Sequence, residues 1–434
     1  MLNIVETFSG IGAQSEALKR ARIPFKVSNT VEWELSAMYA YDILHNGPQD
    51  LSKYRSYNKE TLLNELSQYS LSSNGKEPMT EKALAALSEG QLKAIYHAIE
   101  NNNNLVDITE VTAEDLDDDI DILTYSFPCQ DLSVSAHWWN NTSGLDRGSG
   151  NRSSLLWEIE RILMEFDESD KALPKFLVME NVTAIRSKAH IKNFTIWTDF
   201  LGDLGYVNQI YDLSATDFGV PQTRKRTYMV SVYVGDDENL RKDVEDYFLF
   251  NNLEKIRLDS TLIKPISNYL RLDYSNANYL NEAISATPNF TPSRAKIFNN
   301  NVILATDSEA DDTQIAKTIT TKQDRNPNSG LIAYSENPLV EDARYRNLTP
   351  REAFLLMGFN EECFDNLTVN NPSDIVKNNF LTQAKLLKLA GNSIVVDVLA
   401  AVFTQIYDIY NNILPENIKK TENETGIKIE INFG

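Results

Sequence analysis

The stretch LNIVETFSGIGAQSEALKR, residues 2–20, decides the fold class. An apolar run ends at Phe8, a glycine turn follows, and apolar residues at helical spacing then run from Ala13 to Arg20. A second strand-like segment covers residues 25–31, so strand, helix and strand alternate as they do in an α/β unit. Further such runs predict a doubly wound, mostly parallel sheet; they cover residues 120–126, 176–179 and 227–234, with helices at 154–166 and 194–204.

Composition sets the outer limits. The 434 residues include 41 Lys plus Arg and 62 Asp plus Glu, so the formal charge is 41 − 62 = −21, which taken alone argues against a nucleic-acid binder. A hydrophobic share of 42% allows a large core. The chain lacks a long uncharged apolar run and a signal-peptide start, so we expect a soluble cytoplasmic protein that contacts no membrane. Two Cys exclude a disulfide framework, and four scattered His give no metal signal, so no metal site is predicted.

Changes in pattern along the chain predict its domains. Residues 1–234 carry the α/β alternation, interrupted at 46–105 by a polar helical insertion that we interpret as decoration. From 235 to 343 the pattern breaks into short strand-like pieces and Asn-rich turns, which indicates a smaller, irregular, β-containing domain. Helical periodicity returns at 344–414, and 415–434 is a polar tail.

The glycine turn and the acid after it indicate a bound nucleoside. The loop FSGIG, residues 8–12, follows a strand and opens a helix, although the third glycine of a dinucleotide fingerprint is missing. Glu32 ends the second strand, where it can accept hydrogen bonds from both ribose hydroxyls, and Trp33 can stack on a purine. Asp107 and Ile108 can serve the adenine. A tight turn and a solvated acid are the plainer alternatives, and these residues do not separate NAD from S-adenosylmethionine.

A single cysteine lies where α/β sheets place their chemistry. Cys129 follows Pro128 just past the carboxyl end of the buried strand at 120–126. Polar residues after it predict an exposed turn and a nucleophile, although a cysteine beside an apolar strand is often core filler. The Gly- and Asn-rich segment 133–152 that follows is typical of a lid.

Further polar groups follow other strands. Glu180 and Asn181 end the buried strand at 176, and Arg224 and Arg226 are spaced so that both can point to one side of a strand. The segment Gly391-Asn392-Ser393 is interpreted as a glycine turn and N-cap that open the last helix. Each of these three features, taken alone, has a plain structural explanation. Their order along the chain has no such explanation.

In that order, the motifs clearly resemble those of the DNA cytosine-5 methyltransferase family, over about residues 2–234 and 344–405. The motifs that carry the resemblance are FSGIG at 8–12, PCQ at 128–130, ENV at 180–182, QTRKR at 222–226, RNLTPREA at 346–353 and GNS at 391–393. The stretch around Cys129 looks most like mollicute-type members that modify CpG.

The resemblance implies a Rossmann-like class I methyltransferase that uses S-adenosylmethionine to methylate carbon 5 of a flipped-out cytosine in a specific duplex DNA sequence. Cys129 would add to carbon 6 of the base, Glu180 would neutralise N3 and Arg226 would bind O2. Arg224 would support the pocket, and Asn181 would order the turn that carries Pro128 and the cysteine.

The resemblance also assigns the binding residues. Those implied for the cofactor are Phe8, Gly10, Gly12, Glu32, Trp33, Asp107, Ile108 and Asn392. Residues 235–343 would be the target-recognition domain, and the residues implied for DNA are Ser133, Arg152, Thr320, Thr321, Lys322 and Arg325. A solvated β-turn is the plainer interpretation of the Thr-rich loop.

We therefore expect a monomeric bacterial modification enzyme that acts on double-stranded DNA, with or without a cognate restriction endonuclease. A tRNA cytosine-5 methyltransferase is the alternative, disfavoured by the second domain; an inactive binder is disfavoured by the complete set of catalytic residues. Bases gather near the motif loops, so a basic cleft on an acidic body would reconcile DNA binding with the charge of −21.

Overall fold

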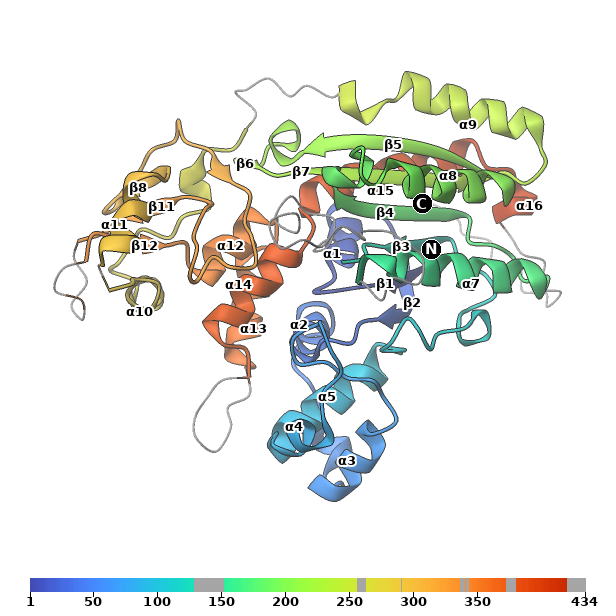
Figure 1. The fold of residues 1–434 in the computed structure, drawn as a ribbon. Coiled ribbons are helices and arrows are strands. Elements are labelled where there is room, and N and C mark those ends of the chain that lie inside the picture. Colours follow the sequence, from blue (N-terminus) through green and yellow to red (C-terminus); the bar gives the residue numbers. More distant parts are fainter. Residues whose placement is uncertain are drawn as a thin grey trace, which may run out of the picture.

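The computed structural model describes residues 1–128, 152–255, 263–289, 291–335, 340, 343–371 and 380–419. Its centre is a six-stranded sheet in the order β2-β1-β3-β4-β7-β5 (Figure 1). The strands are parallel except β7, which runs antiparallel to both β4 and β5. The predicted doubly wound, mostly parallel sheet is confirmed, with these bounds: β1 (Leu2–Thr7), β2 (Phe25–Val31), β3 (Ile122–Tyr125), β4 (Phe176–Val182), β5 (Tyr206–Ser214) and β7 (Lys225–Tyr233).

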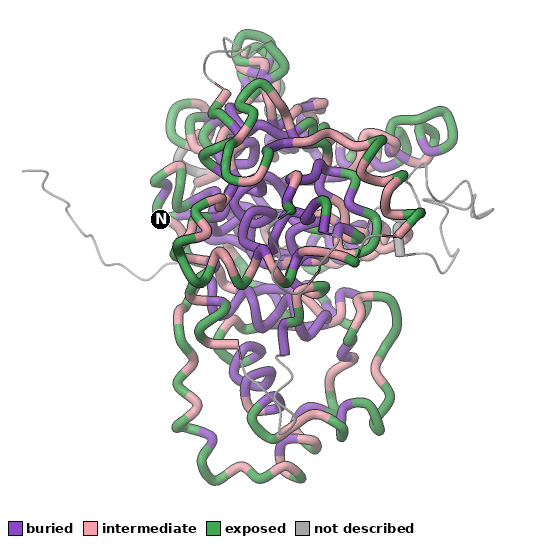
Figure 2. Tube along the Cα trace, turned by 90° about the vertical axis from the view of Figure 1, so that its left-hand side faces the viewer, coloured by how far each residue is buried: buried purple, intermediate pink, exposed green. Residues whose placement is uncertain are grey.

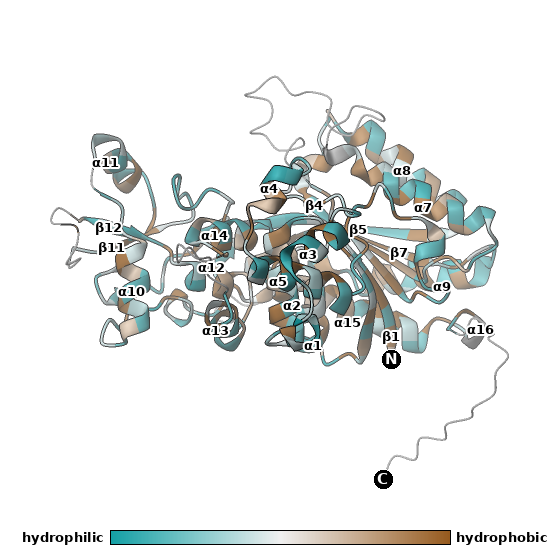
Figure 3. Cartoon of the chain, turned by 90° about the horizontal axis from the view of Figure 1, so that it is seen from below, coloured by the Kyte–Doolittle hydropathy of each residue, from teal (hydrophilic) through white to brown (hydrophobic). Residues whose placement is uncertain are grey.

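Both faces of this sheet are buried. Successive residues of a strand point to opposite faces, so Ile4 and Val5 in β1 enter two different hydrophobic clusters. On one face lie α1 (Ala13–Arg20), α2 (Leu35–Asn46) and α15 (Val396–Asn412); on the other lie α7 (Leu156–Glu168) and α8 (Ile191–Asp203). Figure 2 shows the resulting buried centre, and Figure 3 shows the hydrophobic strands between more polar helices. The near-continuous apolar strands are thus explained by helices on both sides.

The insertion is helical, as predicted, but it is tied into the core. It contains α3 (Lys59–Leu66), α4 (Glu81–Ala85) and α5 (Glu89–Asn101), and α5 packs on α2. The fully buried Asp42 of α2 accepts hydrogen bonds from the Asn101 amide (2.8 Å) and pairs with the His97 ring (2.9 Å). The description of the insertion as decoration is therefore wrong for its packing.

A second group of elements lies to one side of the sheet. Its four-stranded sheet has the order β12-β11-β8-β9 and carries two helices. The elements are α10 (Ala277–Ser285), α11 (Pro292–Asn299), β8 (Ile303–Thr306), β9 (Glu309–Ala310), β11 (Leu331–Ala333) and β12 (Tyr345–Asn347). β10 (Ala316–Lys317) instead pairs with β6 (Gln222–Thr223) in a separate two-stranded sheet, and β6 leads into β7 of the main sheet.

The edges of the second group differ from the predicted 235 and 343. Helix α9 (Glu238–Phe250) lies on the main sheet, because Tyr247 donates from its hydroxyl to Asp408 (2.5 Å) and Gln405 donates to the carbonyl of Asn251 (2.7 Å). At the other edge β12, which belongs to the second sheet, lies entirely after residue 343. The predicted boundary at 235 placed α9 in the second domain, because an amphipathic pattern does not say which part of the fold a helix packs on.

The C-terminal part returns to the main sheet through α12 (Pro350–Leu356), α13 (Glu361–Val369), α14 (Gln383–Asn392), α15 and α16 (Glu416–Lys419). The predicted helix opening at Gly391 is wrong: Gly391 and Asn392 close α14, and α15 starts at Val396 after an extended Ser393. Among the described residues, one helical stretch, Gln383–Asn412, is apolar and long enough to cross a membrane, but 72% of its most apolar window is buried in the fold. That burial is typical of a core helix.

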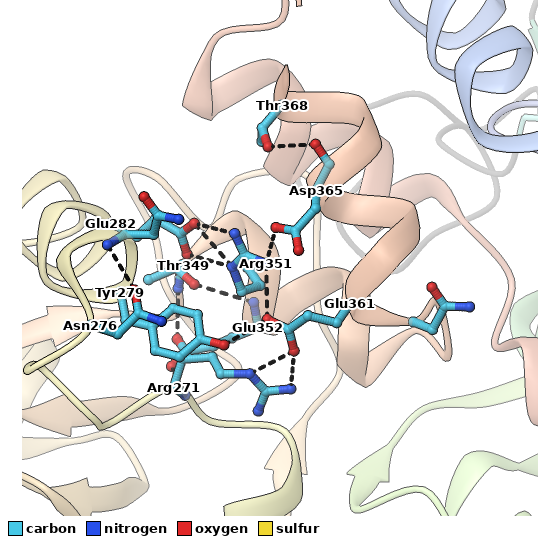
Figure 4. A network of polar contacts seen from close by, with 12 residues as sticks. Arg271, Asn276, Tyr279, Glu282, Thr349, Arg351, Glu352, Glu361, Asp365 and Thr368 are labelled. Carbon is cyan, nitrogen blue, oxygen red and sulfur yellow. Dashed lines mark hydrogen bonds and ion pairs between the residues drawn. The ribbon is translucent and has the colours of Figure 1, made fainter. Parts of the chain in front are cut away.

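A polar network joins α10 to α12 and α13 (Figure 4). Arg351 donates to Glu282 of α10 at 2.8 Å and to Glu361 and Asp365 of α13 at 2.9 and 2.7 Å. The guanidinium of Arg346 forms two hydrogen bonds of 2.8 Å with Glu352, and both side chains are fully buried. Glu352 also caps α12 by accepting the N–H of Thr349 (2.8 Å).

Loss of one partner of this buried pair should be costly. Arg346→Met leaves the Glu352 carboxylate buried without its counter-charge, so the free energy of unfolding should fall by about 3–5 kcal/mol. Urea denaturation followed by circular dichroism measures the change. The control is Glu89→Gln, which breaks an exposed pair with Lys93 in α5 and should leave stability nearly unchanged. Equal effects of the two substitutions would contradict the conclusion that the buried Arg346–Glu352 pair stabilises the fold.

Candidate active site

A cavity of about 440 Å³ lies at the carboxyl edge of the main sheet. Segments that follow four strands line it, because parallel strands bring their carboxyl ends to one edge. These segments are Phe8–Gly10 after β1, Glu32–Glu34 after β2, Ser126–Pro128 after β3 and Glu180–Val182 at the end of β4. Four of the segments singled out in the sequence therefore line one cavity.

Glu32 fastens the glycine loop to the end of β2. Its carboxylate accepts the N–H of Gly10 at 3.0 Å and the N–H of Glu34 at 2.8 Å. Gly10 has a φ of +56°, and the space where a β-carbon would point is open, so the loop exposes its main chain to the cavity. Burial raises the pKa of Glu32 to about 7, against the two N–H donors that favour its ionised form.

Gly12 lies against the side chains of α2. It is not among the residues that line the cavity. Its φ is +73°, and a β-carbon there would lie 2.2 Å from the ring of His45 and 2.7 Å from that of Tyr41. Gly12 therefore allows α1 to start against α2, and its expected contact with the cofactor stays a prediction.

The other residues expected at the cofactor all line the cavity: Trp33, Asp107, Ile108 and Asn392. Asn104, the last of four consecutive Asn, was not predicted as a site residue. It links the segment that follows β2 to the segment that carries Asp107 and Ile108. Its side chain accepts the N–H of Glu32 at 3.0 Å and of Val106 at 3.0 Å, and donates to the carbonyl of Glu32 at 2.9 Å. No sequence signal distinguishes it from the three Asn before it.

Glu180 and Arg226 face each other across neighbouring strands. The β4–β7 register pairs Val182 with Arg226, and the Arg226 Nε lies 3.3 Å from a carboxylate oxygen of Glu180. That oxygen is buried and has no hydrogen bond from the described residues. Burial raises the pKa of Glu180, opposed by the guanidinium groups of Arg226 and Arg224. A buried acid that tends to hold its proton, beside a cation, can donate to one atom of a ligand while the cation binds another.

Asn181 orders the turn after β3. The side chain is buried and donates to the carbonyl of Phe127 at 3.1 Å, just before Pro128. Pro128 lines the cavity. Cys129 and Ser133, the side chain of Arg152 and the predicted lid at 133–152 lie outside the residues whose side chains the structure describes, so their expected roles stay predictions.

Arg224 lines the cavity but uses its donors on main-chain carbonyls. The buried guanidinium donates to Ile319 at 2.9 Å, Gly391 at 3.2 Å and Ser393 at 2.6 Å. Gln222, which sequence analysis did not single out as a site residue, adds to this clamp: its side chain donates to the carbonyl of Leu356 at 2.9 Å and accepts the N–H of Ile319 at 3.0 Å. Arg224 is thus a positioning residue, as its expected supporting role implies.

The clamp brings the Thr-rich loop to the cavity rim. A β-carbon on Gly391 would lie 2.5 Å from the carbonyl carbon of Thr320 and 2.6 Å from the nitrogen of Thr321, so loop and helix end are in direct contact. Lys322 is exposed, and the side chain of Arg325 is 77% exposed. Two cations beside the rim are therefore accessible to a large anionic ligand.

Comparisons with known proteins agree on one family. The family model described as C-5 cytosine-specific DNA methylase matches residues 67–408. An orphan methyltransferase, M.SssI, from Spiroplasma monobiae is 33% identical over 425 residues, covering 93% of this chain and 97% of that protein. A type II methyltransferase, M2.ScrFI, from Lactococcus lactis subsp. cremoris is 30% identical, covering 94% and 99%.

Solved structures support the same fold. The Dnmt2 methyltransferase of S. pombe superposes with a TM-score of 0.57 at 19% identity, covering 95% of this chain and all of that one. The Entamoeba histolytica methyltransferase EhMeth gives 0.54 at 15% identity, covering 94% and 98%.

The contact between Gly391 and the Thr-rich loop predicts a measurable effect. Gly391→Ala must push the loop away or strain α14, so the free energy of unfolding should fall by about 1–3 kcal/mol. The matched control is Gly202→Ala in α8, where nothing lies within 4 Å of the added carbon. That substitution should hold or raise stability by up to about 1 kcal/mol. Thermal or urea unfolding compares the two, and a Gly391 variant as stable as the control would refute the close approach.

Proposed function

This chain belongs to the C-5 cytosine-specific DNA methylases and transfers a methyl group from S-adenosylmethionine to carbon 5 of cytosine in DNA; we propose that the reaction takes place in the cavity at the carboxyl edge of the sheet. The observation that carries this proposal is that Glu180, Arg226 and the turn before Cys129 border the same cavity as Glu32 and the glycine loop. A base and a nucleoside cofactor can therefore meet there.

The side chains suit the chemistry of the base. Carbon 5 of cytosine is a weak nucleophile until a group adds at carbon 6, and we assign that addition to the thiolate of Cys129. Electrons then move towards N3 and O2 of the ring. Glu180 supplies a proton to N3 and Arg226 binds O2, which stabilises the adduct. After carbon 5 is methylated, loss of its proton and departure of the Cys129 sulfur restore the aromatic ring.

The cavity also fits the cofactor, which supplies the methyl group when bound. Each oxygen of the Glu32 carboxylate already accepts one main-chain N–H, and each has a second lone pair for a ribose hydroxyl. Trp33 and Ile108 offer apolar surfaces to the adenine, and Asp107 an acceptor for its amino group. Phe8, Gly10 and Asn392 would complete the site.

We assign recognition of duplex DNA to the second group of elements, residues 263–347, with residues 1–255 and 348–414 as the catalytic domain. Lys322 and Arg325 carry charge suited to phosphates or guanine edges, while Thr320 and Thr321 present the loop against α14. The target cytosine would be flipped out of the duplex into the cavity. Ser133 and Arg152 would contact phosphates from the lid.

We further propose that the enzyme is a cytoplasmic monomer of a bacterial modification system. One relative is named an orphan methyltransferase and another a type II methyltransferase, so relatives occur under both descriptions. A cognate restriction endonuclease, where one exists, would share the DNA sequence and not form part of the enzyme.

The nucleophile can be tested directly. Cys129→Ala should abolish transfer of labelled methyl groups to duplex DNA, because carbon 5 is no longer activated, while binding of S-adenosylhomocysteine should stay close to that of the unchanged protein. The unchanged protein should methylate duplex DNA and not tRNA, and bisulfite sequencing of a plasmid from an expressing host should show the target. Full activity of the alanine variant would refute the assigned nucleophile, and preference for tRNA would refute the assigned substrate.

The raised pKa of Glu32 predicts how cofactor binding depends on pH. Ribose hydroxyls donate to the carboxylate, so binding requires the ionised form. Affinity for S-adenosylhomocysteine should rise as the pH increases through about 7, by up to about tenfold per unit below the pKa, and level off above it. Calorimetry between pH 6 and pH 8 measures this range. Glu32→Gln should bind more weakly and lose most of the dependence; a profile unchanged by that substitution would assign the titration to another group.

A further inference from the structure

The insertion contributes a wall to the cavity through one turn, residues 72–78, which we call the insertion turn. Asn74, Gly75 and Pro78 line the cavity together with Glu34 and Lys388. We propose that Lys388 clasps the insertion turn over the cofactor half of the cavity and thereby slows release of the cofactor. The proposal rests on the assignment of that half to S-adenosylmethionine.

The base of the turn continues the end of β2. The N–H of Ser72 donates to the carbonyl of Trp33 at 2.8 Å, and the N–H of Leu35 donates to the carbonyl of Ser72 at 2.9 Å. These bonds place the turn directly beside the two residues proposed to contact the adenosine, Glu32 and Trp33. A displacement of the turn would thus alter the wall next to them.

The turn is ordered by its own side chains. The hydroxyl of Ser72 accepts the N–H of Gly75 at 2.9 Å and donates to the carbonyl of Glu77 at 2.7 Å. The side chain of Asn74 accepts the N–H of Lys76 at 2.8 Å. The turn is therefore a compact unit that one strong contact can hold in place.

Lys388 of α14 provides that contact. Its ammonium group donates to a carboxylate oxygen of Glu34 at 2.7 Å and to the carbonyl of Asn74 at 2.7 Å. The side chains are 23% and 8% exposed, so solvent screens the pair only in part. A β-carbon on Gly75 would lie 3.0 Å from the same oxygen of Glu34, which shows how closely the turn rests on it.

The clasp spans the two elements that supply opposite cofactor residues. Glu34 follows Glu32 at the end of β2, whereas Lys388 lies one helical turn before Asn392 on α14. The contact thus links three separate parts of the chain: β2, the insertion and the last part of the fold. Lys388 acts on the cofactor through the turn, so it is a positioning residue and not a catalytic one.

The test compares variants of the holoenzyme by the dissociation constant for S-adenosylhomocysteine and by steady-state kinetics. Lys388→Met keeps the length of the side chain and removes the charge. It should raise the dissociation constant and the KM for S-adenosylmethionine about tenfold, as expected for the loss of a charge-assisted hydrogen bond. The KM for DNA and kcat at saturating cofactor should stay within about twofold, because the catalytic residues are untouched. Lys388→Arg should restore most of the affinity.

Two further variants distinguish the loss of the Lys388 contact from a nonspecific effect of a substitution in α14 or the insertion turn. Lys385→Met removes a charge from the same helix, but that ammonium group donates to the carbonyl of Phe380, so its cofactor affinity should stay near that of the unchanged protein. Gly75→Ala disturbs the clasp from the insertion side and should weaken cofactor binding as Lys388→Met does. Unchanged affinity in Lys388→Met, or equal losses in Lys385→Met, would overturn the clasp alone. Failure of the unchanged protein to bind S-adenosylhomocysteine would overturn the proposed cofactor site as well.

Discussion

The buried guanidinium of Arg224 is the interaction on which the arrangement of the site depends. It binds main-chain carbonyls of Ile319, Gly391 and Ser393, which belong to the second group of elements and to the α14–α15 junction. A guanidinium has donors in a rigid plane and no acceptor, so it can hold several carbonyls at fixed angles where a lysine could not. Gln222 continues the same contact by linking Ile319 to Leu356. Three distant stretches of chain therefore meet beside β7.

The net charge of −21 is distributed over the whole fold, and the expected basic cleft is not found in the cavity. Asp119 and Asp121 precede β3 and pair with the buried ammonium of Lys175, at the edge of the sheet opposite to the cavity. The cavity itself is not basic, because Glu32, Glu34, Asp107 and Glu180 line it together with Arg224, Arg226 and Lys388. The exposed Lys322 and Arg325 lie in and after the Thr-rich loop that contacts the end of α14. Overall charge reports solubility, whereas the local distribution decides which ligand a cleft attracts.

Local patterns predicted the central sheet well. The helix at 13–20 and the strand at 25–31 have the predicted bounds, although β2 is an edge strand whose first four residues are not buried. Strand β5 was missed: Asn208, Gln209 and Asp212 interrupt its apolar residues, since β5 is an edge strand and these side chains are only half-buried. Helix α9 was not foreseen on the main sheet, because its amphipathic pattern says that it packs but not where.

The types and the order of the motifs along the chain sufficed to predict the family and its chemistry, because each motif follows a strand and parallel strands end at one edge of a sheet. The roles of the glycines could not be predicted in this way: Gly10 opens the loop to the cavity, Gly12 makes room for His45, and Gly391 ends a helix against Thr320 instead of starting one. The tertiary structure also shows that the insertion is not a peripheral addition: its turn at 72–78 lines the cavity and is bound by Lys388. The residue type alone does not show why a glycine is needed at a position. Its neighbours in the fold decide whether the missing β-carbon leaves space for a ligand, a ring or another part of the main chain.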